Sequence, residues 1–409
     1  MSLLVWVGID DTDTYDKGCT TYVMYNILKE FIKTRSEERV VGYPRLIRLN
    51  PNIPFKTRGN AAVSVGLNVD DIREAVELAE WAVDAYSSRV GKTSPGIVVS
   101  TTNSEHWIYW KAISDVIPID VALRWMRRLG VVHRGGRGVI GALASVMADL
   151  STDSTFELLA YGESTPKPNI PTGIVETLDS STAPLTFENI GDGYTLIQPH
   201  GNDPVVFGVR GDSPYHLLHF ATVLTSEVDV EPRWLIYLTN QATEHHMKHI
   251  ANKPYTPGYI EGNVGSVTVI SGGNLEIKAS SGVVFSYRHY GFKRLDKATY
   301  LLAYGGLRPG PKDLDLYMEG GVALLGKVDV NNPKCPRCGG NLESTGRVGL
   351  LRCTRCGLVT GVPRLLGYVG EVILEEPRGS EVRHLHKPLG RVSLEGLANV
   401  FNRPSLWIV

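Results

Sequence analysis

The sequence predicts a multidomain protein in which α/β and α+β units are combined with a small β-barrel and a metal-binding ribbon. The first 160 residues or so alternate between apolar runs of strand length and stretches with helical periodicity. Residues 262–325 contain short apolar runs separated by glycine-rich turns, and two CxxC pairs follow. At 409 residues the chain is too long for one hydrophobic core, so we expect several domains.

The N-terminal part predicts an α/β domain of roughly 190 residues. A continuous apolar run over residues 3–9 has the length of a strand buried on both faces, and it stops at an acidic loop. A helix with apolar residues at three- and four-residue spacings is expected from Thr20. The further elements expected are a strand over 61–67, a helix over 72–86, a strand over 97–100, helices over 118–129 and 139–150, and a strand over 156–161.

The rest of the chain predicts three smaller units. The segment 164–186 is rich in Pro, Thr and Ser, which favours an irregular connection. The apolar runs VVFGVRG and Trp234 to Thr239 predict a small α+β unit, and the later runs have the rhythm of a barrel such as an oligonucleotide-binding (OB) fold. The expected domain ranges are therefore 1–193, 194–254, 255–329 and 330–409.

Composition narrows the class of protein. The chain has 43% hydrophobic and 21% charged residues, with 42 Lys and Arg against 43 Asp and Glu. This balance excludes both an acidic disordered chain and a uniformly basic nucleic-acid coat, so any nucleic-acid surface is local. No apolar segment is long enough to cross a bilayer, and the cysteine usage is typical of a reducing compartment, which together predict a cytoplasmic protein.

The motif GIDDTD places Asp10, Asp11 and Asp13 just after the first predicted strand. Like charges this close repel one another unless a cation lies among them, and Mg²⁺ is held by one or two carboxylates together with substrate phosphates. The motif therefore predicts a Mg²⁺–nucleotide site, with Asp10 and Asp11 as metal ligands. Thr20, at the start of the next helix, is a candidate phosphate ligand or phosphorylated hydroxyl. Simple capping and turn formation remain the alternative for these residues.

A second candidate phosphate site is HRGGRGVIGA, in which Gly136, Gly138 and Gly141 open a helix beside Arg134 and Arg137. Glycines allow backbone amides to approach a phosphate, and a helix N-terminus favours an anion. Because GIDDTD occupies the first turn of the domain, this pattern predicts phosphate binding without a dinucleotide cofactor. A glycine turn with surface arginines is the alternative. In KTRGNAAV, Arg58 precedes a strand and could clamp a phosphate or a carboxylate, with an ordinary solvated loop arginine as the alternative.

The segment TNQATEHH offers Asn240, Gln241, Glu244 and His246 as polar contacts to a substrate, with Glu244 a candidate partner for a cationic group. A metal site at His245 and His249, four residues apart, is the less favoured alternative. The spacing CPRC(x14)CTRC predicts a closed four-cysteine zinc site, which serves folding rather than catalysis. Basic residues flank the site and provide the local positive patch that nucleic acid requires, although an ordinary solvated ribbon surface is the alternative. The four predicted zinc ligands are Cys335, Cys338, Cys353 and Cys356.

Taken together and in this order, GIDDTD, GCTTY, TRGNAAV, HRGGRGVIGA, TNQATEHH, the late barrel and the ribbon resemble the archaeal isoleucine-tRNA 2-agmatinylcytidine synthetase family over essentially the whole chain. The resemblance implies a kinase-like α/β domain, a ferredoxin-like domain, an RNA-binding OB-fold and a zinc ribbon. Where the family usually has Ser after GIDDTD, this chain has Thr14, which keeps the hydroxyl.

The resemblance also implies the reaction, its cofactors and its partners. ATP activates carbon 2 of the wobble cytidine in a CAU anticodon, and agmatine replaces the oxygen there, so that isoleucine tRNA decodes AUA. Asp10, Asp11 and Asp13 would hold Mg²⁺ and the phosphates of ATP, and Thr20 would be the autophosphorylated threonine. A different ATP-dependent RNA kinase or ligase, or a tRNA-binding protein without catalytic activity, remains the alternative.

Overall fold

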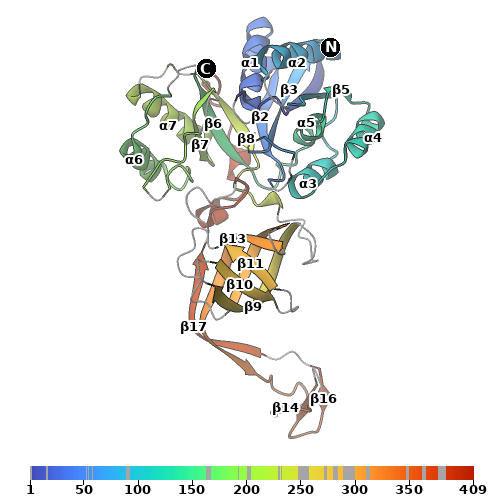
Figure 1. Ribbon diagram of the computed structural model, residues 1–409, viewed down its shortest axis with the longest axis vertical. Coiled ribbons are helices and arrows are strands. Elements are labelled where there is room, and N and C mark those ends of the chain that lie inside the picture. Colours follow the sequence, from blue (N-terminus) through green and yellow to red (C-terminus); the bar gives the residue numbers. More distant parts are fainter. Residues whose placement is uncertain are drawn as a thin grey trace.

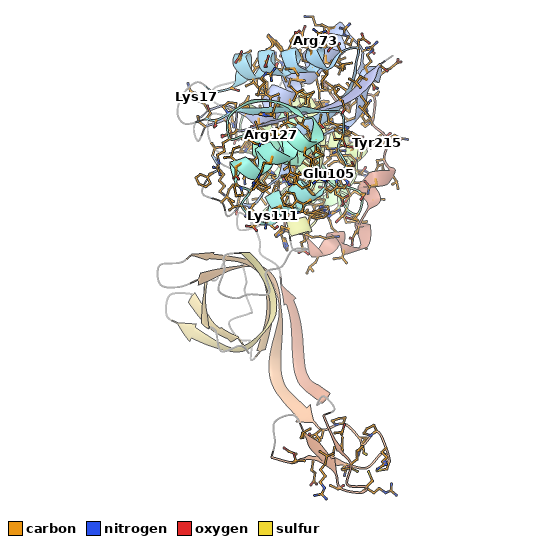
Figure 2. All side chains as sticks on the ribbon, turned by 90° about the vertical axis from the view of Figure 1, so that its right-hand side faces the viewer. Lys17, Arg73, Glu105, Lys111, Arg127 and Tyr215 are labelled. Carbon is orange, nitrogen blue, oxygen red and sulfur yellow. The ribbon has the colours of Figure 1, made fainter. Side chains whose placement is uncertain are left out.

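The computed structural model describes residues 2–409 except 15–16, 52, 54, 58, 89–92, 163–166, 192, 200–203, 229–230, 232, 247–257, 271–273, 280–283, 289–299, 310–313, 347–349, 362–364 and 376–383. Within 258–331 and 365–375 it describes backbone only. The molecule is elongated, with a globular α/β part at one end, a barrel in the middle and a small ribbon at the other end (Figure 1). In the view turned by 90°, the barrel strands form a ring between these two ends (Figure 2).

One eight-stranded sheet runs through the globular part, in the order β5-β4-β1-β3-β2-β8-β6-β7. Its first five strands come from the N-terminal unit, where β1, β3, β4, β2 and β5 pair only antiparallel with one another. The order β4-β1-β3-β2 with helices after β1 and β3 is the split βαβ arrangement. The elements of this unit are β1 (Leu3–Asp10), α1 (Thr20–Thr34), η1 (Glu37–Arg39), β2 (Val40–Arg48), β3 (Ala61–Val69), α2 (Ile72–Tyr86), β4 (Gly96–Ser100), α3 (Trp107–Ser114), α4 (Ile119–Leu129), β5 (Val132–Gly135) and α5 (Val139–Val146).

The central strand β1 is buried on both faces because helices cover both sides of the sheet. Val5, Val7 and Ile9 belong to the core formed with α1 and α2, whereas Trp6 belongs to the core formed with α3, α4 and α5. This alternation follows from the two-residue period of a strand. It explains why the sequence of β1 is continuously apolar although its neighbours are antiparallel.

The second unit completes the sheet with β6 (Thr155–Tyr161), β7 (Val205–Gly211) and β8 (Trp234–Thr239), and it contains α6 (Thr172–Thr182) and α7 (Pro214–Glu227). Strand β6 pairs antiparallel with both β7 and β8, and β8 joins β2 through a short parallel pairing. The core of α1 and α2 continues into this unit through residues such as Phe156, Phe207 and Phe220. The two units therefore share one sheet and one core.

A six-stranded sheet in the order β11-β10-β9-β12-β13-β17 forms the barrel, and a parallel pairing of β11 with β13 closes it. Strand β13 is long enough to pair first with β12 and then, further along, with β17. The ribbon follows as a three-stranded sheet. The elements are β9 (Gly258–Ile270), β10 (Asn274–Ala279), β11 (Val284–Arg288), β12 (Tyr300–Pro309), β13 (Leu314–Asn331), β14 (Leu342–Ser344), β15 (Leu351–Cys353), β16 (Val359–Thr360) and β17 (Leu365–Glu375).

After the barrel the chain returns to the globular part as a strap, which we define as residues 384–409. It contains η5 (Leu389–Leu394) and η6 (Leu397–Val400). The strap's last residue is bonded to the second unit in both directions, since the N–H of Trp234 donates to the Val409 carbonyl at 3.2 Å and the N–H of Val409 donates back at 3.1 Å. The barrel and ribbon are thus an insertion between two segments that are both anchored in the globular part.

The mixed α/β class expected from the sequence is confirmed, and most of the expected elements are present. The prediction that 164–186 is irregular was wrong, because α6 lies inside it and buries Val175 and Leu178 against the second unit. The helix expected over 139–150 ends earlier, at Val146. Strands β2 and β5 were missed. In β2, the Gly, Pro and Arg residues interrupt the alternation on which strand prediction depends.

Candidate functional site

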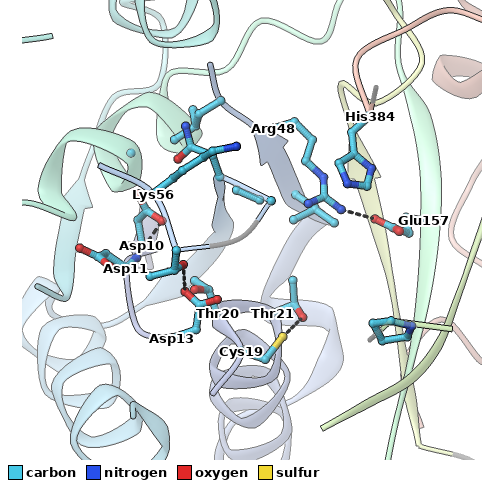
Figure 3. Close-up of a pocket in the computed structure, with 18 of the residues that line it drawn as sticks. Asp10, Asp11, Asp13, Cys19, Thr20, Thr21, Arg48, Lys56, Glu157 and His384 are labelled. Atoms are coloured by element: carbon cyan, nitrogen blue, oxygen red, sulfur yellow. Dashed lines mark hydrogen bonds and ion pairs between the residues drawn. The ribbon is translucent and has the colours of Figure 1, made fainter. Parts of the chain in front are cut away.

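A pocket of about 710 Å³ lies where the two units of the globular part meet (Figure 3). Strands β1, β2, β5, β7 and β8 all run in one direction, as the pairings require, so their carboxyl ends lie along the same edge of the sheet. Asp10 ends β1 and Arg48 ends β2, while Arg210 lies one residue before the end of β7. All three line the pocket. The shared sheet therefore brings residues far apart in the chain to one site.

The acidic motif forms one corner of this pocket, and Asp10, Asp11 and Asp13 all line it. The N–H of Asp11 donates to Oδ1 of Asp10 at 2.7 Å, and Thr57 donates its hydroxyl to Oδ1 of Asp13 at 2.9 Å. Asp11 itself adopts a left-handed backbone with φ of 57°, a conformation that is costly for a residue with a Cβ atom. The turn is therefore held in a specific shape by contacts around it.

Burial and mutual repulsion change the ionisation of this corner. Burial raises the pKa of Asp10 well above its usual value. Burial, followed by the neighbouring charge of Asp13, raises the pKa of Asp11 to about 6, while the positive charge of Arg137 opposes the shift. A group of carboxyls that resists ionisation is the environment in which a bound cation is favourable.

The geometry of the corner fits a Mg²⁺ ion shared with phosphates better than a closed metal cage. Among the described residues, only the four cysteines form a set of three or more His, Cys, Asp or Glu side chains whose ligand atoms lie within 4.8 Å of one another. The three aspartates therefore do not converge on one point. Mg²⁺ is bound in proteins through one or two carboxylates, with phosphate oxygens and water completing the octahedron.

Thr20 lies beside this corner at the start of α1 and lines the pocket. Its hydroxyl accepts a 3.1 Å hydrogen bond from the hydroxyl of Thr12, and its side chain is largely buried. Cys19, which precedes it, also lines the pocket, and its Sγ lies 2.9 Å from the hydroxyl of Thr21 (Figure 3). The structure thus brings Thr20 and the aspartates together in the way that the sequence predicts.

Gly138 and Gly141 of the glycine-rich loop line the pocket, and the loop's binding of phosphate stays a prediction. The structure shows a further, local role for the loop. The N–H of Gly136 donates to the Pro95 carbonyl at 2.7 Å, and the N–H of Gly138 donates to the Ser94 carbonyl at 2.8 Å. The N–H of Arg137 donates to the Ser94 hydroxyl at 2.7 Å. These three amides are therefore already used inside the protein.

The glycines instead allow α5 to approach the end of β1. A Cβ atom at Gly141 would lie 2.0 Å from Oδ2 of Asp10, and one at Gly138 would lie 2.6 Å from the Asp10 carbonyl oxygen. Because these positions have no side chain, the helix leaves room for the Asp10 carboxyl beside it. Arg137 lines the pocket, whereas Arg134 does not. Arg134 is exposed and forms an ion pair with Glu80 at 2.9 Å. Arg58 lies outside the described residues.

The opposite wall of the pocket is an ionic network that the sequence analysis missed. Glu157 lies 3.6 Å from Arg48 and 3.5 Å from Arg210, and Arg210 also pairs with Glu188 at 3.2 Å. Arg210 is 2.9 Å from Nδ1 of His384, which comes from the strap. Figure 3 shows His384 beside the paired Arg48 and Glu157. Burial lowers the pKa of Arg48, and Glu157 opposes that shift. A signal was present, because Glu157 and Arg210 are the only charged residues in otherwise apolar strands.

The four polar residues predicted to contact substrate lie behind this wall, and none of them lines the pocket. Asn240 is fully buried and accepts a 2.8 Å hydrogen bond from the backbone N–H of Arg48, while Gln241 donates to Glu157. The N–H of Glu244 donates to the Leu385 carbonyl at 2.8 Å, and His246 is buried. Their direct contact with substrate stays a prediction; Asn240 and Gln241 support the wall itself.

The ribbon brings its four cysteines together, as the sequence predicts. The Sγ atoms of Cys335 and Cys356 lie 3.6 Å apart, as do those of Cys338 and Cys353. Thiolates placed tetrahedrally at zinc–sulfur bond length are roughly 3.8 Å apart. The N–H of Cys356 donates to Sγ of Cys353, which lowers the pKa of that thiol to about 6. The cluster therefore fits a structural zinc ion.

In the part of the chain that the structure describes, none of the helices is long and apolar enough to span a membrane.

Comparisons with known proteins agree with this arrangement. A family model described as the TiaS TCKD domain matches residues 6–135, and one described as the TiaS FLD domain matches residues 136–246. The chain is 73% identical over 407 residues to the isoleucine-tRNA 2-agmatinylcytidine synthetase TiaS of Caldivirga maquilingensis, and the match covers 100% of both chains. It is 39% identical to the protein of the same name from Pyrobaculum neutrophilum, covering 94% of this chain and 95% of the relative.

Solved structures of proteins named TiaS also match this chain, over 96% of its length. A crystal structure of TiaS in complex with its isoleucine tRNA and ATP matches with a TM-score of 0.74 and 31% identity, covering 96% of this chain and 99% of the other. A crystal structure of TiaS with the same tRNA, AMPCPP and agmatine matches with a TM-score of 0.72 and 29% identity, covering 96% and 98%.

Proposed function

Because this chain belongs to the TiaS family of isoleucine-tRNA 2-agmatinylcytidine synthetases, we propose that it uses ATP to join agmatine to carbon 2 of the wobble cytidine in the CAU anticodon of isoleucine tRNA. The modified base pairs with adenosine, so that AUA is decoded as isoleucine. The observation that carries this proposal is the full-length identity of 73% to a relative of that name. Relatives crystallised with ATP, an ATP analogue, agmatine and isoleucine tRNA support ATP, agmatine and this tRNA as the partners.

The pocket geometry supports a division of roles along its length. We assign the acidic corner to the phosphates of ATP, with Asp10 and Asp11 as ligands of a Mg²⁺ ion and Asp13 beside them. A bound Mg²⁺ would neutralise charge on the phosphates during transfer. Arg137 lines the same corner and is the cation that opposes the negative charge of Asp11. Thr20 is the hydroxyl placed to receive a phosphoryl group.

The chemistry explains why one pocket must hold ATP and the base together. A pyrimidine carbonyl oxygen is a poor leaving group, but phosphorylation converts it into one that leaves as phosphate. The amine of agmatine then forms the new bond to carbon 2 and loses a proton as the carbon–oxygen bond breaks. To reach the pocket, the wobble base must leave the stacked anticodon.

The distant barrel and ribbon suit a second task, which is to hold the tRNA. We propose that they bind other parts of the molecule through its backbone and shape, since contacts of that kind position RNA without reading the reacting base. The closed β11-to-β13 sheet supports an OB-type barrel, and the cysteine cluster supports a structural zinc ion. The ranges 255–329 and 330–409 for these parts stay a prediction.

The first boundary, expected between residues 193 and 194, also stays a prediction. Strand β6 lies before residue 193 but pairs with β7 and β8, so it belongs to the second unit. The two family matches meet between residues 135 and 136. Both observations favour a boundary nearer residue 136. We keep the kinase-like and ferredoxin-like descriptions for the two units as part of the proposal.

The proposal is tested by incubating purified protein with Mg²⁺, ATP, labelled agmatine and a CAU isoleucine tRNA transcript. Label is expected in the tRNA only when ATP and Mg²⁺ are both present. Asp11→Asn is expected to abolish incorporation while tRNA affinity changes less than about twofold, because phosphate ligands and distant tRNA contacts are separate. A stable phosphorylated tRNA formed without agmatine would instead indicate an RNA kinase.

A further inference from the structure

The entrance of the pocket exposes large aromatic and apolar side chains. Phe55 is 58% exposed, Val116 is 45% exposed and Tyr194 is 43% exposed, and all three line the pocket. An aromatic side chain that stays exposed at a ligand site offers its flat face to a partner. Phe55 is the most exposed of the three, so its ring is the one most available.

The ring of Phe55 is held against a cation. The guanidinium carbon of Arg137 lies 3.8 Å from the ring centroid, within the range of a cation–π contact. The backbone of Arg137 is fixed by its hydrogen bond to Ser94, and its charge acts on Asp11. Two residues after Phe55, Thr57 donates its hydroxyl to Asp13. The aromatic ring is therefore tied to the acidic corner from two sides.

A ring and a guanidinium side by side form a surface that suits an unpaired nucleobase. Proteins recognise single-stranded RNA by stacking its bases on aromatic rings and on guanidinium planes. A pocket of about 710 Å³ accommodates a nucleotide but not a folded anticodon loop, so the rest of that loop meets the entrance. Resting on the proposed function, we propose that Phe55 with Arg137 stacks an unpaired base of the anticodon loop and thereby positions the wobble cytidine.

The adenine of ATP has the same stacking chemistry, so the experiment must separate the two sources. We compare Phe55→Ala and Phe55→Trp with the wild-type protein, and use Tyr215→Ala as a control because Tyr215 is 49% exposed and does not line the pocket. Four quantities are measured: the affinity for the CAU isoleucine tRNA transcript, the affinity for ATP without tRNA, and kcat and KM for the tRNA.

Loss of one stacked base weakens binding by about 5- to 150-fold. For Phe55→Ala we expect a loss of tRNA affinity in that range and a matching rise in KM for tRNA, with ATP affinity unchanged. Phe55→Trp is expected to restore tRNA binding, because a larger ring stacks at least as well, and Tyr215→Ala is expected to behave as wild type.

A loss of ATP affinity with unchanged tRNA affinity would overturn the proposal in favour of adenine stacking. Unchanged values in both measurements would show that Phe55 binds no base. The binding measurements need no agmatine and no turnover. If the wild-type protein incorporates no agmatine, the proposed function fails, while the tRNA affinities still decide whether Phe55 stacks a base.

Discussion

At the scale of residues, the site contains carboxyl groups whose ionised form is unfavourable without a bound cation. Asp10 and Asp11 are held in a turn with a left-handed residue, and burial raises the pKa of both. Strain and shifted ionisation at one place are typical of a functional site rather than of a helix cap. The capping alternative is also weakened because the N-cap residue of α1 is Cys19, and its side chain makes no capping hydrogen bond to a backbone N–H of the helix.

Mg²⁺-dependent binding of ATP is predicted to weaken in mild acid. Burial and Asp13 raise the pKa of Asp11 to about 6, so the carboxyl is protonated below that pH and a cation must displace the proton. Affinity for Mg²⁺–ATP should therefore be constant near pH 8 and fall by about tenfold per pH unit below pH 6. Titration calorimetry from pH 8 to pH 5 checks this, and equal affinity at pH 7 and pH 5 would contradict it.

The pocket residues differ in how far the sequence alone could predict them. Asp10, Asp11, Asp13 and Thr20 were predictable because they lie in one short motif between a strand and a helix. Arg48, Glu157, Arg210 and His384 come from four distant segments, and only the shared sheet and the strap bring them together. No spacing in the sequence predicts that these four residues lie together.

At the scale of elements, two contacts position the site: the close approach of α5 to β1, and the attachment of the strap. The sequence predicts that the glycine pattern at the start of α5 binds a phosphate. In the structure the loop amides bond within the protein, and the glycines allow the helix to reach Asp10. A glycine motif alone does not distinguish a ligand's approach from a helix's approach.

Gly141→Ala is predicted to disturb the acidic corner. The new methyl group would lie 2.0 Å from Oδ2 of Asp10 and 2.8 Å from Leu49, so either α5 or the carboxyl must move. Overpacking of this kind costs about 1–3 kcal/mol, and we expect ATP-dependent turnover to fall with it. Gly173→Ala in α6 is the matched control, because nothing lies within 4 Å of its Cβ position. Urea unfolding and ATPase assays compare them, and equal stability would contradict the packing argument.

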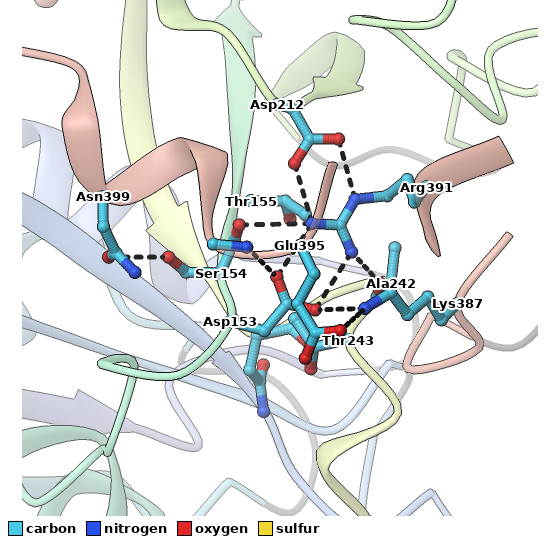
Figure 4. A network of polar contacts seen from close by, with 12 residues as sticks. Asp153, Ser154, Thr155, Asp212, Ala242, Thr243, Lys387, Arg391, Glu395 and Asn399 are labelled. Carbon is cyan, nitrogen blue, oxygen red and sulfur yellow. Dashed lines mark hydrogen bonds and ion pairs between the residues drawn. The ribbon is translucent and has the colours of Figure 1, made fainter. Parts of the chain in front are cut away.

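The strap is predicted to depend on one buried arginine. Arg391 is 1% exposed and donates to Asp212 at 2.7 and 2.8 Å and to Asp153 at 3.0 Å (Figure 4). Arg391→Met would leave two buried carboxylates without this partner, which costs about 3–5 kcal/mol.

Thermal or urea unfolding measures the effect of Arg391→Met. Arg124→Met provides the control, because its pair with Asp120 is exposed and such pairs contribute little to stability. Similar stability of the two variants would show that the network does not hold the strap.

At the scale of the whole molecule, the site and the proposed tRNA-holding part lie in different regions. The barrel and ribbon extend away from the globular part (Figure 1), and His384, at the start of the strap, lines the pocket. The chain segments before and after the insertion are hydrogen-bonded to each other, since the N–H of Ala242 donates to the His384 carbonyl at 2.9 Å. Because His384 also contacts Arg210, the insertion is anchored directly in the pocket wall.

Loss of the ribbon's metal site is predicted to weaken tRNA binding before it affects ATP. Cys353→Ser removes one of four clustered thiols, and structural zinc sites contribute directly to folding. The acidic corner lies in another part of the molecule, so ATP affinity should stay within about twofold of wild type. Filter binding with the tRNA transcript and ATP titration measure the two effects. A soluble variant that binds tRNA normally would remove the ribbon's proposed role.

The overall order of parts was predictable because each part has its own local pattern, namely strand–helix alternation, glycine-separated strands and paired cysteines. The sharing of one sheet between the first two units was not, since the short pairing of β2 with β8 joins residues almost two hundred positions apart. Substrate identity came from the family rather than from these patterns.

The most direct test of the central claim compares two tRNAs that carry the same CAU anticodon. Protein, Mg²⁺, ATP and agmatine are incubated with isoleucine tRNA or with methionine tRNA, and the nucleosides are analysed by mass spectrometry. The account predicts agmatine joined to cytidine in the isoleucine tRNA alone, because a tRNA held along the whole molecule is recognised beyond its anticodon. Tight binding of the isoleucine tRNA without any modified cytidine would contradict the account.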